Sequence, residues 1–145
     1  MFARETRVPV IQTQSEIQRM LDRAKAKQYS TGVDYDLRMA RVQFRLHDRV
    51  VRFTLALPDP GKHRSTERYA KAERQRWRAL LLVIKAKLES VESQIETFEE
   101  AFLANIVMPN DQTVAQIVLT QVAESYKTGK MRALGPAPTE AGNGA

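Results

Sequence analysis

Residues 77–102 carry the sequence WRALLLVIKAKLESVESQIETFEEAF, which contains neither glycine nor proline. Its apolar residues recur at alternating spacings of four and three, at Trp77, Leu81, Ile84, Leu88, Val91, Ile95, Phe98 and Phe102. This 3.5-residue period is typical of a coiled coil or of a long helix in a packed hairpin. The pattern predicts a helix that starts near Thr66 and extends to about Ala104.

The segment around Thr97 leaves two alternatives for this helix. Thr97 and Glu100 have the spacing of a capping box, in which the two side chains accept hydrogen bonds from each other's backbone amides. The helix therefore either continues through Thr97 or breaks near Glu96 and restarts. In both cases the apolar seam predicts self-association, most simply as a dimer, through Leu81, Ile84, Leu88, Val91, Ile95 and Phe98.

Upstream of this helix, three short segments alternate between apolar and polar residues. They cover residues 29–35, 40–46 and 51–57, and turns are expected between them. Alternation with a period of two is the pattern of strands that have one buried face. Pro58 and Pro60 then end the sheet, because proline cannot donate to a strand ladder. We predict an α+β fold: a three-stranded antiparallel sheet with a short N-terminal helix, a long central helix and a C-terminal helix.

The two ends of the chain have weaker patterns. Residues 1–12 show no clear period and are predicted to form an N-terminal arm. Thr13 would then cap a helix that ends near Lys27. A further capping box at Thr113 opens a last helix, which Gly129 would end. We expect residues 13–134 to form one domain and residues 135–145, rich in Gly, Pro and Ala, to be disordered.

Composition argues against several classes of function. The chain has 145 residues, no cysteine and only two histidines, His47 and His63, both expected on the surface. It has no phosphate-binding glycine loop and too few ligands for a zinc site, so we expect no enzyme activity and no cofactor. Without an apolar run of about 18 residues or a secretory leader, we expect no membrane contact and a cytoplasmic location.

Charge is segregated along the chain. The formal net charge is +6, and residues 61–88 hold nine Lys or Arg against two acidic residues, whereas residues 89–100 hold five glutamates and no cation. This order opposes the helix macrodipole, which favours anions at the N-terminus and cations at the C-terminus. Three explanations remain open: the basic half contacts a polyanion, two such helices pair antiparallel, or the charges are only solvated.

The positions of the cations predict a surface that binds nucleic acid. Alternation predicts that Arg41, Arg45 and Arg52 share the open face of the sheet, next to the basic half of the helix. Positive charge interleaved with aromatic rings suits single strands, although Tyr29 and Tyr35 fit a core position as well. We expect one continuous electropositive surface formed by Arg41, Arg45, Arg52, Arg64, Arg68, Lys71, Arg74, Arg78 and Lys85.

The glutamates offer a weaker metal hypothesis. Glu92, Glu96 and Glu99 would stack on one face of a continuous helix and could hold Mg²⁺. Nucleases that use divalent metals usually draw carboxylates from several elements, so a solvated face or a stripe that pairs with a basic partner is favoured. We therefore expect no metal site.

Two resemblances add to this interpretation. The blocks Arg74–Glu89 and Thr97–Ala104, with Val8-Pro9-Val10 and Leu57-Pro58-Asp59-Pro60, resemble a family of small uncharacterised proteins from tailed bacteriophages and prophages. This resemblance implies a phage origin and action in the bacterial cytoplasm, but no activity. The element order alone is similar to the core of Rad52-like single-strand annealing proteins, and fold analogy is weak evidence for function.

The expected function is that of a non-enzymatic phage accessory protein that binds nucleic acid, with single strands favoured by the charge and aromatic pattern. The alternative is a protein-interaction module that binds and inhibits a host defence or replication protein. A minor virion or assembly component is a third hypothesis. Nucleic acid, a second copy of the chain and a host protein are thus the candidate partners.

Overall fold

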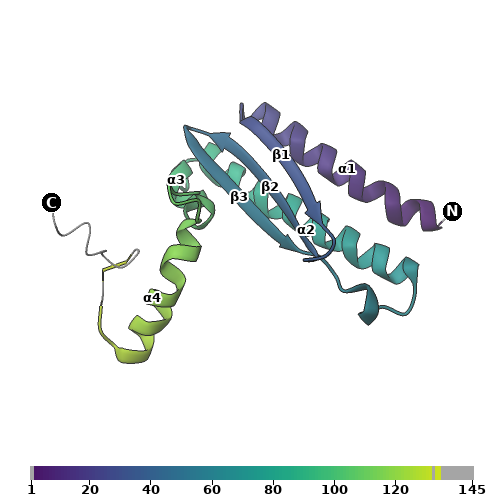
Figure 1. Cartoon of the computed structure of the whole chain (residues 1–145). Coiled ribbons are helices and arrows are strands. Elements are labelled where there is room, and N and C mark those ends of the chain that lie inside the picture. Colours follow the sequence, from purple (N-terminus) through teal and green to yellow (C-terminus); the bar gives the residue numbers. More distant parts are fainter. Residues whose placement is uncertain (1, 132, 135–145) are drawn as a thin grey trace.

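The computed structural model describes residues 2–131 and 133–134, and of residues 2–9 it describes only the backbone. The elements follow in the order α1 (Phe2–Arg23), β1 (Lys27–Asp34), β2 (Met39–Leu46), β3 (Arg49–Ala56), η1 (Pro60–Lys62), α2 (Thr66–Glu92), α3 (Phe98–Phe102), η2 (Leu103–Asn105) and α4 (Val114–Thr128) (Figure 1). The predicted α+β class is confirmed. The predicted tail, residues 135–145, lies outside the described residues.

The sheet is an antiparallel meander in the order β1-β2-β3. Strand β2 alternates strictly: Ala40, Val42, Phe44 and Leu46 are buried, and Arg41, Gln43 and Arg45 point to the opposite face. The turn between β2 and β3 has only two residues, His47 and Asp48, with φ values of 51° and 58°. Both residue types tolerate this left-handed conformation, so a tight hairpin forms without the Asn-Gly pair that usually predicts one from sequence.

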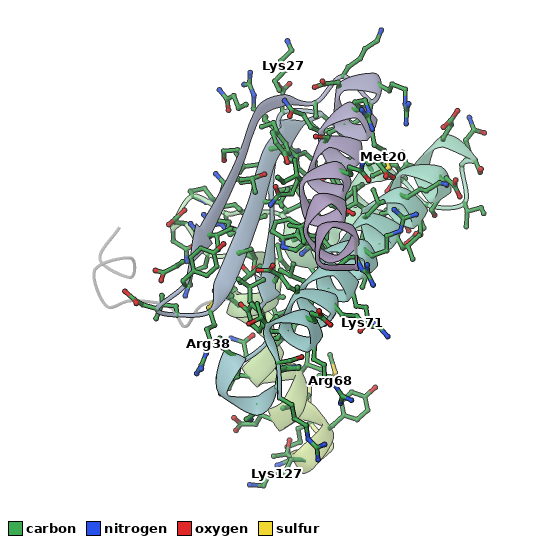
Figure 2. All side chains as sticks on the ribbon, turned by 90° about the vertical axis from the view of Figure 1, so that its right-hand side faces the viewer. Met20, Lys27, Arg38, Arg68, Lys71 and Lys127 are labelled. Atoms are coloured by element: carbon green, nitrogen blue, oxygen red, sulfur yellow. The ribbon has the colours of Figure 1, made fainter. Side chains whose placement is uncertain are left out.

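Helices α1 and α2 cover one face of the sheet as a second layer, visible from the side in Figure 2. They run parallel, because Gln12 lies near Arg74 at one end of the pair and Ala24 lies near Leu88 at the other. The core between the layers combines Ile17 and Leu21 of α1, the inner residues of β2 and β3, and Trp77, Leu80, Leu81 and Ile84 of α2. Among the described residues, no helix layer covers the opposite face of the sheet (Figure 2).

The prediction of an N-terminal arm is wrong, because residues 2–12 belong to α1. Thr13 is not a helix cap but a core position, with 2% of its surface exposed. Val10, Thr13 and Ile17 follow at helical spacing, and all three pack toward the body of the molecule. Thr13 and Glu16 have the three-residue spacing of a capping box, so the sequence fits a helix start and a core position equally well.

The central helix breaks, as one of the two alternatives predicted. Helix α2 ends at Glu92, and α3 restarts behind Thr97, where the capping box with Glu100 has both hydrogen bonds. Gln94 adopts a left-handed φ of 61° in the turn between the two helices. The break lets Phe98 and Phe102 turn back onto the sheet, where Phe102 meets Phe44 and Phe53 edge to face.

The predicted oligomer seam is wrong for most of its members. Leu81, Ile84 and Phe98 are buried in the core of their own chain, and Leu88 and Val91 pack against it. Only Ile95, in the turn after α2, is largely exposed. The 3.5-residue period thus arises from packing within one chain. A helix that covers a sheet needs an apolar stripe similar to that of a helix that pairs with another helix.

The C-terminal segment is joined to the open face of the sheet through Arg52. The Arg52 guanidinium donates to the Gln43 Oε1 at 3.0 Å, to the Asp111 carbonyl at 2.9 Å and to the Asp111 carboxylate at 2.7 Å. Ile106 forms a bridge with Val51, and the Val107 amide donates to the Val50 carbonyl. Arg52 is 7% exposed, so the prediction that it contacts nucleic acid is wrong, because its donors are used within the chain.

Replacing Arg52 with methionine should lower the free energy of unfolding by about 1.5–3 kcal/mol, the usual worth of hydrogen bonds to a charged group. The guanidinium also lowers the pKa of Asp111. The ion pair therefore adds to the free energy of unfolding above the unfolded-state pKa of Asp111, and this addition is lost as pH falls through the folded-state pKa. Urea unfolding should therefore show a difference in the free energy of unfolding between wild type and Arg52→Met at pH 7, and this difference should become smaller in acid. Arg41→Met, on the exposed part of the same face, is the control and should cost less than about 0.5 kcal/mol.

Candidate nucleic-acid interface

A groove runs along the solvent side of the helix layer, between α1 and α2. Because the two helices are parallel and side by side, their facing residues enclose three adjoining hollows of about 280, 370 and 420 Å³. Residues of α1 from Gln12 to Arg23, with Ala24 just after the helix, form one wall, and residues of α2 from Arg74 to Glu92 form the other. We call this feature the α1–α2 groove.

Cations dominate most of the groove. Arg19 and Arg23 project from α1, and Arg74, Arg78 and Lys85 project from α2. Arg78 lies 3.4 Å from the Glu16 carboxylate, but both side chains are about half exposed, so the pair is weak. Arg19, Arg23 and Lys85 form no hydrogen bond or ion pair within the described part of the chain. Their charges are therefore available to an anion from outside.

The groove also has an apolar floor and an acidic end. Met20 and Leu88 are half-buried, and Leu82 is 55% exposed beside Arg78 and Lys85. At the C-terminal end of α2, Glu89 and Glu92 replace the cations. An anionic ligand would thus be held over the part between Arg74 and Lys85 and repelled from the end of the helix.

The expected single electropositive surface is wrong, because the predicted cations divide between opposite faces. Arg41 and Arg45 lie on the open face of the sheet, whereas Arg74, Arg78 and Lys85 line the groove beyond the helix layer. Arg68 and Lys71 are exposed near the start of α2, away from Lys27 at the other end of the molecule (Figure 2). Arg64 is exposed just before α2. A two-layer fold separates any strand face from the outer side of its helices.

The tyrosines do not join the cations of the sheet. Tyr29 packs against the core and accepts a hydrogen bond from the Thr31 hydroxyl at 2.6 Å. Tyr35 is 69% exposed in the turn after β1. Tyr29 lies on the same side of the sheet as the helices, so its ring takes the core role that the sequence also allowed and does not stack beside Arg41 or Arg45.

The glutamates do not form a metal centre. The break after α2 separates Glu92 from Glu99, Glu96 accepts a hydrogen bond from the Ser90 hydroxyl, and Glu99 lies 3.6 Å from Arg49. Among the described residues, no cluster of three or more His, Cys, Asp or Glu side chains could hold a metal ion. The stacking expected of Glu92, Glu96 and Glu99 required a continuous helix.

The histidines and the perturbed groups lie away from the groove. His47 is exposed and its ring lies 4.9 Å from that of Phe98. His63 is half-buried, and its Nδ1 is 2.9 Å from the Asp59 carbonyl oxygen. Burial raises the pKa of Tyr69 and of Glu73 near the start of α2. These shifts come mainly from desolvation, which also occurs at purely structural positions.

Sequence reasoning missed Arg19 and Arg23, which supply the α1 wall of the groove. A signal was present: the two arginines are four residues apart and flank Met20 at the edge of the apolar stripe that contains Ile17 and Leu21. Residues spaced in this way lie on one side of a helix. The sequence did not reveal that α2 would lie parallel to that side.

No family model, curated protein or solved structure matches the chain. The described part of the chain also contains no helix with the length and hydropathy needed to cross a lipid bilayer.

Proposed function

We propose that this protein binds nucleic acid without catalysis, through the α1–α2 groove. The observation that supports this proposal is the set of unpaired cations, Arg19, Arg23 and Lys85, that face one another across the groove beside Arg78. Lysine and arginine bind phosphate by charge and hydrogen bonds, and counterion release makes such binding favourable at low salt.

Single strands fit the groove better than a duplex. Arg78 and Lys85 are seven residues apart on α2, or about 10 Å along the helix axis, which allows contacts with a few successive phosphates. Leu82 and Met20 offer apolar surface between the two rows of cations. A single strand can place its bases on such a floor, whereas a duplex keeps its bases stacked inside. The phage resemblance would place this activity in a bacterial cytoplasm, as an accessory function.

The test is a salt series with a labelled single-stranded oligonucleotide. Fluorescence anisotropy should show binding at about 50 mM salt, with a log–log slope of roughly −2 to −3.5 for three to five neutralised phosphates. A duplex of the same length should bind more weakly. If no binding is detected at about 50 mM salt, the proposal is wrong.

The apolar floor favours one second candidate, a protein-interaction module. An amphipathic helix with an acidic face could lie between α1 and α2, with its apolar residues on Leu82 and Met20 and its carboxylates near the cations. The ligand would then be a segment of a host defence or replication protein. This function predicts a stoichiometric complex that survives nuclease treatment and that a single-stranded oligonucleotide does not displace.

A further inference from the structure

Helix α4 carries an apolar stripe that the rest of the described chain leaves open. Ala115, Leu119, Val122 and Tyr126 follow at spacings of four, three and four, which is the a/d pattern of a coiled coil. Leu119 is 62% exposed, Val122 is 37% exposed and Tyr126 is 89% exposed. We call these four residues the α4 seam. It is separate from the apolar seam on α2, whose residues pack mostly in or against the core of their own chain.

Hydrogen bonds to the rest of the described body hold the base of α4. Thr113 caps the helix through a complete capping box, and the Val114 amide donates to the Ile106 carbonyl. Beyond this point, α4 leaves the body past α3, and neither the sheet nor the α1–α2 layer lies alongside it (Figure 1). A helix of 15 residues is marginal in water without tertiary packing. A partner on the exposed stripe would supply that packing.

The seam is complementary to a second copy of itself in the antiparallel direction. Pairing two α4 helices about a two-fold axis between Leu119 and Val122 sets Ala115 against Tyr126 and Leu119 against Val122. The smallest residue then meets the largest at both ends, and two aliphatic pairs fill the centre. A parallel pair would instead set tyrosine against tyrosine and alanine against alanine, which leaves one end crowded and the other empty.

The residues beside the seam also favour a like partner. The positions that flank an a/d seam are Gln116, Val118, Ala123 and Ser125, and none of them carries a charge. Charged flanks usually decide partner choice in coiled coils, and like charges there would repel an identical helix. Neutral flanks remove that obstacle and offer nothing to attract a partner of opposite charge.

We propose that this protein forms a two-fold symmetric dimer through antiparallel pairing of the α4 seam. Four layers make a small interface, so we expect a dissociation constant of about 10–100 µM, in the range of weak and transient associations. This dimer does not depend on the nucleic-acid proposal, since α4 lies outside the α1–α2 groove.

The first test measures mass against concentration. Sedimentation should show a shift from the 16.5 kDa chain toward twice that mass as concentration rises from about 1 to about 300 µM. Leu119→Glu with Val122→Glu should remain monomeric throughout, and Trp77 fluorescence should report an unchanged body because both residues are exposed. Thr120→Glu, on the opposite side of α4, is the matched control and should dimerise normally. A wild-type protein that stays monomeric at about 300 µM overturns the proposal and leaves the seam to a different partner.

The second test fixes the direction of pairing. The chain has no cysteine, so Ala115→Cys and Tyr126→Cys each introduce the only thiol. Antiparallel pairing predicts that a mixture of the two variants forms a disulfide between the copies on mild oxidation. Either variant alone should crosslink poorly, because like positions then lie about 16 Å apart along the axis. Crosslinks within each single variant, but not between the two, would contradict the antiparallel arrangement.

Discussion

Replacing Phe102 with alanine is expected to lower the free energy of unfolding by about 3–5 kcal/mol, the usual loss for a buried phenylalanine. Phe102 is fully buried and joins three elements: its ring lies 6.3 Å from Phe44, 6.3 Å from Phe53 and 5.0 Å from Phe98. The truncated side chain would leave a cavity between α3 and the sheet. Domains of this size are stable by only about 5–15 kcal/mol, so a large part of the stability would be lost.

Urea unfolding followed by the fluorescence of Trp77 gives the measurement, since this is the only tryptophan and the substitution leaves it in place. The next residue provides a matched control. Leu103 is 52% exposed, and Leu103→Ala should change the free energy of unfolding by less than about 1 kcal/mol. Equal losses for the two variants would show that α3 does not place Phe102 in the core.

Removing the unpaired cations of the groove is expected to reduce single-strand binding by about 500-fold at about 50 mM salt. Arg19→Gln, Arg23→Gln and Lys85→Gln together remove three phosphate contacts. Each contact contributes a salt slope of about −0.7, which corresponds to roughly eight-fold in affinity at this salt concentration. The log–log slope should therefore become shallower by about 2. Anisotropy titrations between about 50 and 200 mM salt measure both quantities.

The two-layer fold supplies the control for this experiment. Lys27, Arg41 and Arg45 share the open face of the sheet, on the side away from the groove. Changing these three to glutamine removes the same net charge. If binding depends on the groove, this variant should keep nearly all of its affinity, apart from a small effect of net charge. Equal losses for the two triple variants would mean that binding follows total charge and not the α1–α2 groove.

Local patterns in the sequence predicted most of the elements. Alternation in residues 40–46 and 51–57 is strong enough to define two strands and the face that each buries. The capping boxes at Thr97 and Thr113 correctly indicate two helix starts, and Gly129 adopts the left-handed φ expected at a helix end. The capping box at Thr13 was misleading, because a polar threonine can also fill a small core position.

The candidate site could be predicted only in part. Arg74, Arg78 and Lys85 are recognisable as one basic stripe, because spacing along a helix fixes which side chains share a side. Their neighbours Arg19 and Arg23 lie more than fifty residues away in the chain, and only the packing of α1 beside α2 brings them together. Arg52 follows the same alternation as an exposed strand arginine, yet Asp111 from a distant loop covers it.

Spacings within a few residues are enough to predict the α+β class, the meander and its buried face, and they allow a helix break at Thr97 without deciding it. The tertiary structure decided where the charges and apolar stripes lie relative to one another. Placing both helices on one face of the sheet divides the cations between two surfaces and buries the seam of α2 within the chain. That division arises because the sheet must bury its apolar face. Local sequence patterns show that this face exists, but they do not show which helices cover it.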